Sequence, residues 1–443
     1  MVGRRDEREY GEVITVEIDR RVFLTTVGAA GLAGCSDFIS GSESNDGTDG
    51  RTDNEPAEDD ADAANASTES ETNVVDDFEE LEHWRSGEVE LLADTEFYLT
   101  GTQSARHEAS ETGEAVQFER TDLSLDLTDR RLAMACCVHA DDVSTQTLGI
   151  TVEDGDENQL LFRAQVGKTG EDTDFSYRDF GVHSVLSDTA PDLGAIESIQ
   201  LQPGFEDTAG TIWFDDLSLV EMPDVPKLMI QWDDGFESQY TEGFPIQSRY
   251  DIPSTIFVIT DRIGGEGYLT LEQLEEMYDH GWEIASHLMT HPRLSELSPE
   301  EQETEIRGAK DWLIDHGFEA DAEYFAYPFG DYDQSSYELI KEYHTIAMVR
   351  GEPGHGVPTD PALVGRGVGQ TLEDATEYID RLTEWGGIGG LLWHGLPDET
   401  PIDEFDAIMA YIHEREEAGD LEVITLSDLE GIIDELAIDI DEA

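Results

Sequence analysis

Five ionisable side chains in the C-terminal half of the chain have the types and the spacing that metal-assisted hydrolysis needs. They are Asp233, Asp234, His287, His291 and His394. The Asp pair directly follows an apolar run, the two His are four residues apart, and the last His ends a second apolar run. Carboxylates and neutral imidazoles are ordinary ligands of divalent cations, and either group can also exchange a proton. The five residues therefore predict a metal-dependent hydrolase.

The Asp pair is followed by a glycine that can turn both carboxylates toward one site. Consecutive side chains in a strand point to opposite sides, but Gly235 permits a sharp bend directly after Asp233 and Asp234. One carboxylate could then bind a metal ion while the other accepts a proton. An ordinary Asp-Asp-Gly turn is the alternative for this motif taken alone.

The histidines could complete such a site. A single helical turn between His287 and His291 would place both imidazoles on one side at metal-ligand spacing. His394 stands alone at the end of an expected strand, and a structural role is its alternative. The occurrence of all three motifs in one chain is more specific than any one of them, and it favours the metal site.

The elements that must position these side chains alternate between strands and helices. Apolar runs predict strands at 227–232, 255–260, 282–286, 322–327, 345–349, 363–368, 387–393 and 421–426. Capping boxes at Thr270 and Ser298 predict two of the helices between them. The expected helices are 271–280, 299–316, 335–343, 372–385 and 402–418. About seven such units predict an α/β fold, a distorted (β/α) barrel whose chemistry gathers at the carboxyl ends of its strands.

Four motifs of this region resemble the polysaccharide deacetylase family, also known as the NodB homology domain and as carbohydrate esterase family four. Their order and spacing agree with the family over nearly all of residues 226–430. The motifs are Gln231-Trp232-Asp233-Asp234-Gly235, Ser286-His287-Leu288-Met289-Thr290-His291, Ala326-Tyr327-Pro328-Phe329-Gly330 and Leu392-Trp393-His394.

The resemblance implies a role for each polar residue. Asp234, His287 and His291 would hold one divalent metal ion. Two imidazoles and one carboxylate suit zinc best, although cobalt, manganese and iron accept the same ligands. Asp233 would be the general base that activates water, and His394 would protonate the leaving amine.

The third motif departs from the usual family pattern. Many members have an arginine that orients the base where this chain has Ala326, although members with an Ala-Tyr-Pro form exist. Arg366, near the end of a later expected strand, is a candidate substitute, and an ordinary surface arginine is the alternative. The resemblance implies that the backbone N–H of Phe329 stabilises the oxyanion. Tyr327 and Trp393 are expected to line the substrate groove, with packing in the barrel wall as the alternative.

The charge of the chain is extreme. Its 443 residues include 103 acidic and 25 basic ones, for a formal net charge of −78. Such a surface repels nucleic acid, which excludes that partner. Self-repulsion also destabilises a compact state unless salt screens it, and the Debye length falls to about 3 Å at about 1 M salt. The composition therefore predicts a halophilic protein that works in molar salt.

A β-rich domain is expected at 74–223, before a catalytic domain at 226–435. Short alternating segments predict an antiparallel β-sandwich. Its strands are expected at 88–92, 115–119, 131–138, 148–152, 159–165, 198–202 and 211–220. The segment resembles a carbohydrate-binding jelly roll, in which aromatic residues could stack on sugars or simply form the core, and acidic loops could hold calcium. Cys136 and Cys137 are expected to be buried strand residues.

The first 73 residues predict an export signal and a tether. Arg20 and Arg21 begin a twin-arginine pattern, and Leu32-Ala33-Gly34-Cys35 resembles a lipobox whose cysteine becomes lipidated, so that 1–35 is a lipoprotein signal peptide. An ordinary signal peptide is the alternative. Residues 36–73 are expected to be a disordered acidic linker. The protein would then be exported and held by a lipid anchor alone on the outer face of the cytoplasmic membrane, facing the extracellular space.

These observations favour a metal-dependent hydrolase that removes N-acetyl groups, with O-acetyl groups as the alternative, from an acetylated extracellular polysaccharide. A catalytically impaired surface glycan-binding lipoprotein is one alternative, motivated by the missing arginine. A metal-dependent amidohydrolase acting on a small substrate is the other.

Overall fold

The computed structural model describes residues 73–87, 89–109, 116–140, 146–167, 173–204, 209–350 and 356–436, all within one compact unit, Ser70–Ala443. The predicted twin-arginine signal, the lipobox at Cys35 and all but the last residue of the predicted linker lie outside these ranges. Within them, no helix has the length and apolar character needed to cross a bilayer.

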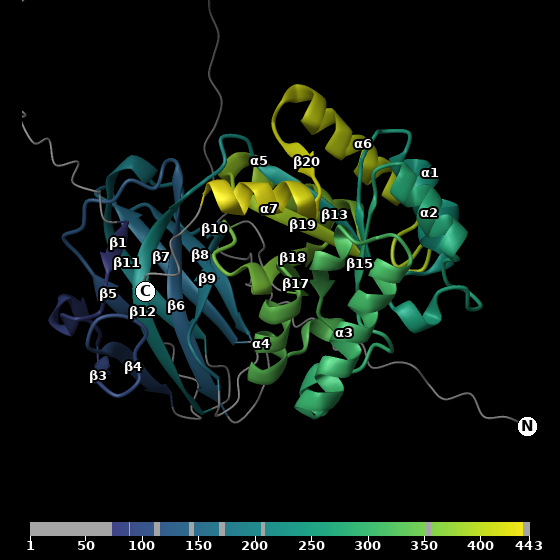
Figure 1. Cartoon of the computed structure of the whole chain (residues 1–443). Helices are drawn as coiled ribbons and strands as arrows, with labels where there is room; N and C mark the ends of the chain where they lie inside the picture. The colour runs from purple at the N-terminus through teal and green to yellow at the C-terminus, as the bar shows by residue number, and fades with distance from the viewer. Residues whose placement is uncertain are drawn as a thin grey trace, which may run out of the picture. The chain divides into compact units, whose positions relative to one another are not determined.

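The N-terminal part of the described chain is a β-sandwich of two antiparallel sheets, as predicted (Figure 1). One sheet has the order β3-β4-β12-β6-β9, with β1 also paired to β12, and the other has the order β10-β8-β7-β11-β5-β2. The strands are β1 (Val74–Asp76), β2 (Trp84–Arg85), β3 (Leu92–Asp94), β4 (Ser104–Ala109), β5 (Phe118–Arg120), β6 (Arg130–Ala140), β7 (Gln146–Asp154), β8 (Gln159–Gly167), β9 (Ser176–Asp179), β10 (Gly181–Val185), β11 (Ile196–Gly204) and β12 (Gly210–Glu221).

Alternation along the strands explains the core of the sandwich. In β6, Met134, Cys136 and Val138 point into the core between the sheets, whereas Ala135 and Cys137 pack on the other face. Both cysteines are free buried thiols, as predicted. The strands that the sequence did not predict, β1, β2, β4, β9 and β10, are short, and β4 carries charged residues on its outer face.

The C-terminal part is a closed barrel of parallel strands, as predicted. Seven strands pair in the order β14-β15-β16-β17-β18-β19-β13, and the pairing of β13 with β14 closes the ring. An eighth short strand, β20, pairs with β13. The strands are β13 (Lys227–Asp234), β14 (Thr255–Val258), β15 (Glu283–Ser286), β16 (Tyr324–Ala326), β17 (Ile346–Arg350), β18 (Val364–Val368), β19 (Ile388–Trp393) and β20 (Glu422–Ile424).

Helices alternate with these strands (Figure 1). They are α1 (Phe244–Gln247), α2 (Leu271–Asp279), α3 (Pro299–Asp315), α4 (Gln334–Tyr343), α5 (Leu372–Trp385), α6 (Ile402–Ala418) and α7 (Leu426–Glu435). The predicted capping boxes at Thr270 and Ser298 begin α2 and α3. The sequence did not predict α1 or α7, and the strand expected at 421–426 ends at Ile424 because Thr425 caps α7.

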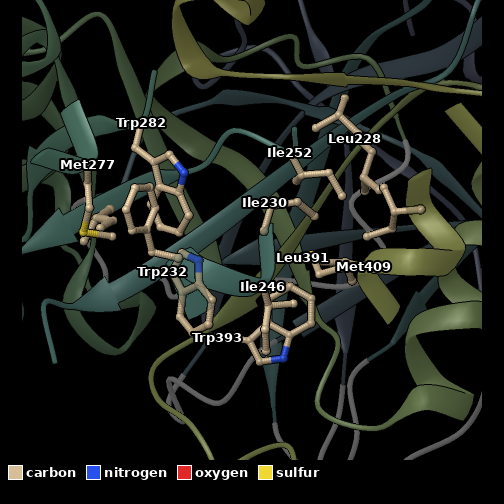
Figure 2. Packing of buried hydrophobic residues seen from close by; sticks show 14 of the residues in the cluster. Leu228, Ile230, Trp232, Ile246, Ile252, Met277, Trp282, Leu391, Trp393 and Met409 are labelled. Atoms are coloured by element: carbon tan, nitrogen blue, oxygen red, sulfur yellow. The ribbon is translucent and has the colours of Figure 1, made fainter. Parts of the chain in front are cut away.

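Strand β13 shows how the fold aims the first motif. Leu228, Ile230 and Trp232 belong to the large core cluster in which Trp232 stacks with Trp282 at 6.5 Å between ring centroids (Figure 2). Since successive side chains alternate, Asp233 falls on the opposite row, which faces the barrel interior. The core therefore fixes the register that sends this carboxylate inward.

Candidate active site

The predicted metal ligands meet where β13 and β15 end. Nε2 of His291 lies 3.3 Å, and Nε2 of His287 3.8 Å, from Oδ1 of Asp234. Among the described residues, these three form the one group of acidic, His or Cys side chains whose ligand atoms all lie within 4.8 Å of one another. The same Oδ1 atom is buried without a hydrogen-bond partner. A buried acceptor facing two imidazoles fits a bound cation, since buried polar groups otherwise have partners.

The backbone around these ligands is strained. Asp234 has φ 72°, Leu288 φ 67° and His291 φ 67°, all in the left-handed region that disfavours residues with a side chain. The helical turn that the sequence predicted for residues 287–291 is therefore wrong, because the segment is an irregular loop. Such strain persists only where surrounding contacts enforce it, and it gathers at functional sites.

Hydrogen bonds from two sides enforce that loop. The N–H of Thr260 donates to the carbonyl of Leu288 at 3.2 Å. From the other side, the carboxylate of Glu305 accepts the N–H groups of Met289 at 3.1 Å and Thr290 at 2.9 Å. The ligand spacing of four residues is thus kept without a helix.

The tautomer of His287 is set by a backbone carbonyl. Its Nδ1 lies 2.7 Å from the carbonyl oxygen of buried Ala326, which can only accept, so Nδ1 carries the proton and Nε2 is free to bind a metal. Burial, and next the interaction with His287, lower the pKa of His291 to about 3. His291 is therefore suited to act as a neutral ligand, and Nε2 of His287 is turned toward the same site.

Asp233 is held by the arginine that the sequence proposed as a substitute. The Arg366 guanidinium donates to Oδ1 of Asp233 at 2.9 Å and to Oδ2 at 2.6 Å, and both side chains are buried. Burial alone would raise the pKa of Asp233, but Arg366, together with His287 and His394, outweighs it and the pKa is lowered. Arg366 lies on β18 and reaches β13 across β19, where a Cβ at Gly390 would stand 3.3 Å from the Cβ of Arg366.

His394 is paired with an acid that the sequence reading missed. Its Nδ1 lies 2.8 Å from Oε1 of Glu399, whose Oε2 accepts the backbone N–H of His394 at 2.6 Å. Burial would lower the pKa of His394, but the bond to Glu399 and the charge of Asp233 raise it. Conversely, burial would raise the pKa of Glu399, but His394 lowers it. Only its position five residues after His394 could have pointed to Glu399, which is a weak signal among 103 acidic residues.

A buried glutamine, Gln239, joins the two acid–base residues and was also missed. It begins the π-helix η3 (Gln239–Gly243), and its side-chain amide donates to the carbonyls of Asp233 at 2.5 Å and His394 at 2.7 Å. Gln239 is completely buried. No sequence motif marks this residue.

Two predicted groove residues belong to the barrel wall. Trp393 is completely buried in the core cluster (Figure 2), and its indole N–H donates to Thr400 at 3.1 Å. Tyr327 is 1% exposed and packs on Phe325 and Tyr332. The substrate-lining role expected for both is therefore corrected to the packing alternative, because neither offers a surface.

Phe329 does face solvent. It is 54% exposed, has φ 61°, and its ring lies 4.6 Å from that of His291 and 4.5 Å from the guanidinium carbon of Arg293. Its place beside a metal ligand is compatible with the predicted substrate or oxyanion role.

The fold and the site together define a class of protein. It is a parallel (β/α) barrel that gathers a His-His-Asp cluster, a buried Asp–Arg pair and a His–Glu pair at the carboxyl ends of its strands. Residues 221–346 match the model of the polysaccharide deacetylase family. The comparisons thus support a polysaccharide deacetylase domain in this part of the chain. The matched span contains Asp233 and the three ligands, but neither Arg366 nor His394.

Curated relatives match about a third of the chain or less. A Bacillus subtilis protein named as a polysaccharide deacetylase, YxkH, is 31% identical over 157 residues, 33% of this chain and 56% of the relative. The poly-beta-1,6-N-acetyl-D-glucosamine N-deacetylase of Staphylococcus aureus is 29% identical over 126 residues, 26% of this chain and 43% of the relative. The chain thus spans about half the length of the curated relatives it matches.

The chain is also similar to a solved structure, that of the peptidoglycan deacetylase PdaC from Bacillus subtilis. It is 19% identical, with a TM-score of 0.35, over 48% of this chain and 94% of that chain.

Proposed function

We propose that this protein is a metal-dependent hydrolase that removes N-acetyl groups from an extracellular polysaccharide. One observation carries the proposal: the Asp233–Arg366 ion pair lies directly beside the Asp234, His287 and His291 cluster. A base and a metal site supplied by consecutive residues are what hydrolysis of an amide by an activated water requires.

The ligand set favours zinc. Two neutral imidazoles and one carboxylate are a common zinc donor set that leaves positions open for water and substrate. When bound, the ion polarises the acetyl carbonyl and lowers the pKa of a bound water toward neutrality. Asp234 supplies the negative charge that holds the cation, and Ala326 keeps His287 in the tautomer that binds it.

Asp233 is suited to take the proton of the attacking water. Its pKa is lowered because the bidentate contact with Arg366, together with His287 and His394, outweighs burial, so it is ionised at neutral pH. The same contact fixes the plane of the carboxylate. This pair fills the place of the family arginine that is absent at Ala326, which removes the motivation for a catalytically impaired glycan-binding protein.

His394 is suited to protonate the leaving amine. Against the effect of burial, the bond from its Nδ1 to Glu399 raises the pKa of the imidazole, which favours its protonated form, and it orients the other nitrogen. An ionised base and a protonated acid are the two states that the reaction needs.

The substrate class is proposed from the name of one relative and from the predicted signal peptide. The name of the Staphylococcus aureus relative specifies a polymer of N-acetyl-D-glucosamine, which makes an N-acetylated polysaccharide the first substrate to test. The predicted lipoprotein signal ending at Cys35 would place the enzyme outside the cell, where such polymers lie. The β-sandwich would then hold the polymer near the barrel.

Acetate release tests the proposal directly. The purified chain in molar salt should contain about one equivalent of zinc, and it should release acetate from an N-acetylglucosamine polymer. Chelation should abolish this release, zinc should restore it, and Asp233→Asn should lack it while keeping its metal. Metal-loaded protein that releases no acetate from any N- or O-acetylated glycan would sink the proposal.

A further inference from the structure

The residues proposed as base and acid stand at the ends of two neighbouring strands that have stopped pairing. Strands β13 and β19 run in parallel register up to Trp232 and Trp393. Asp233 and His394 directly follow this last pair, so no pairing between β13 and β19 joins them, although Asp233 still pairs with Phe257 of β14. A further contact is needed to fix the separation of base and acid closely enough for both to act on one substrate.

The Gln239 side chain does this in place of the ladder. Its single amide nitrogen carries two hydrogens, and it donates to the Asp233 carbonyl at 2.5 Å and to the His394 carbonyl at 2.7 Å. The Asp233 carbonyl has a further donor, the N–H of Gly235, at 3.0 Å. The clamp is therefore most important for His394.

Ser238, the residue before Gln239, bonds to the loop that follows His394. The hydroxyl of Ser238 accepts the N–H of Leu396 at 3.2 Å. A Cβ at Gly395 would lie 3.2 Å from that hydroxyl oxygen, so the loop approaches this closely because position 395 has no side chain. The segment turns here into the π-helix η3, a rare conformation that is frequent at functional sites.

We infer that Ser238 and Gln239 form a clamp that sets the separation of Asp233 and His394, with Gln239 as a positioning residue for the reaction. The inference rests on the proposed function, since it assigns the clamp to the base and acid named there. Gln239 is completely buried, and its side-chain hydrogen bonds go to the two carbonyls, so it acts on the base and the acid through their backbone.

The same barrel offers a matched control. Gln247 is also completely buried, and its amide nitrogen donates to Ser254 at 2.6 Å while its oxygen accepts the indole N–H of Trp232 at 3.0 Å. It holds no residue of the site. Gln239→Met and Gln247→Met each replace a buried amide by an apolar side chain of similar length, so both remove buried hydrogen bonds, and only the first loosens the clamp.

The experiment compares kcat, KM, zinc content and melting temperature of the two variants in molar salt. Gln239→Met should lower kcat by about 10- to 100-fold with KM and zinc content within about two-fold, because misplacement of the acid affects the chemical step. Gln247→Met should lose comparable stability and keep its kcat within about two-fold. Equal losses of kcat in both variants, or a wild-type kcat in Gln239→Met, would overturn the inference.

A readout without turnover separates the clamp from the proposed function. In protein carrying ¹⁵N-histidine, the ring signals of His394 should move in Gln239→Met and stay in place in Gln247→Met, whether or not acetate is released. A wild-type protein without activity whose His394 signals respond in this way refutes the deacetylase proposal and keeps the clamp. If Gln239→Met fails to fold, Ser238→Ala decides: unchanged kcat and unchanged His394 signals overturn the clamp.

Discussion

Two buried carboxylates at opposite ends of the same barrel have pKa values that are shifted in opposite directions. Asp233, at the carboxyl end of β13, is 4% exposed, and Asp321, just before β16, is 6% exposed. Burial raises the pKa of both, but Arg366, with His287 and His394, reverses the effect at Asp233. Asp321 accepts one backbone N–H, from Ile284 at 2.8 Å, and its pKa is raised to about 7. Glu283 nearby adds a like charge to that rise.

The difference shows what each end of the barrel is built for. At the carboxyl end, each acid–base group has a partner of opposite charge, which lowers the pKa of Asp233 and raises the pKa of His394. At the amino end, Glu283 caps the start of α7 by accepting the N–H groups of Leu426 and Ser427, both at 2.9 Å. The carboxylates of Glu283 and Asp321 at that end bind backbone N–H groups and so stabilise the fold. At Asp321 this hydrogen bond only partly offsets the rise in pKa that burial causes.

Removal of Arg366 should have the largest effect, because it makes Asp233 resemble Asp321. Arg366→Met leaves a buried carboxylate without its cation, so kcat/KM should fall by at least about 100-fold. The free energy of unfolding at pH 7 should fall by about 3–5 kcal/mol, the usual consequence of breaking a buried pair. Acetate release and denaturant titration in molar salt measure the two effects.

Two further variants serve as controls for this prediction. The double variant Asp233→Asn, Arg366→Met should regain much of the stability without regaining activity, since it removes both charges. Arg131→Met, which replaces another buried arginine in β6 of the sandwich, should lower stability without reducing kcat. Full activity in Arg366→Met would show that Asp233 needs no partner.

Glu399→Gln tests the second charged pair at the same end of the barrel. The bond from Glu399 raises the pKa of His394, so its neutral replacement should let that pKa fall. The imidazole would then lose its proton at lower pH, and the alkaline limb of the kcat/KM profile should move toward lower pH, with a loss of about 10- to 100-fold at pH 8.

The pH profile of acetate release measures this shift. Glu404→Gln is a matched control, because Glu404 is an acid in the same domain that accepts only the N–H of Leu372. An alkaline limb that stays in place in Glu399→Gln would mean that His394 is not the acid.

The sequence predicted most of the barrel and the ligands because both depend on local patterns. Apolar runs marked every barrel strand, and the ligands lie in contiguous motifs at strand ends. Arg366 was predicted because it stands near the end of an expected strand, even though its contact with Asp233 spans 133 positions. Burial of Trp393 and Tyr327 depends on packing from other elements, which the motifs do not encode.

Glu399 and Gln239 were missed for a different reason. Glu399 is one of many acids, and the partners of Gln239 are two backbone carbonyls that only the folded chain brings together. The loop between the histidines was predicted as a helical turn because the two residues are four apart, and the left-handed conformations of Leu288 and His291 are ones that local preference disfavours. Tertiary hydrogen bonds override that preference, as often happens at functional sites.

The smallest effect is expected at Asp321, and it has the opposite sign. Its pKa is about 7 in the folded chain against 3.8 as a model value, so between about pH 4 and pH 7 the folded state binds more protons than the unfolded state. The contribution of this group to stability is therefore greatest at low pH and is lost as the pH rises through 7. Asp321→Asn keeps an acceptor for the N–H of Ile284 and removes the charge, so it should raise the melting temperature by about 2–4 °C at pH 8.

The same variant should gain less stability at pH 5 than at pH 8, because the loss that Asp321 causes develops between about pH 4 and pH 7 and is incomplete at pH 5. Its kcat should be unchanged at both pH values. Asp233→Asn should behave in the reverse way and melt at a lower temperature at both pH values, because it leaves Arg366 buried without its carboxylate. Differential scanning calorimetry in molar salt distinguishes the two variants. If both variants changed the melting temperature in the same direction at pH 8, the presence of Arg366 beside Asp233 would not explain the difference between the two carboxylates.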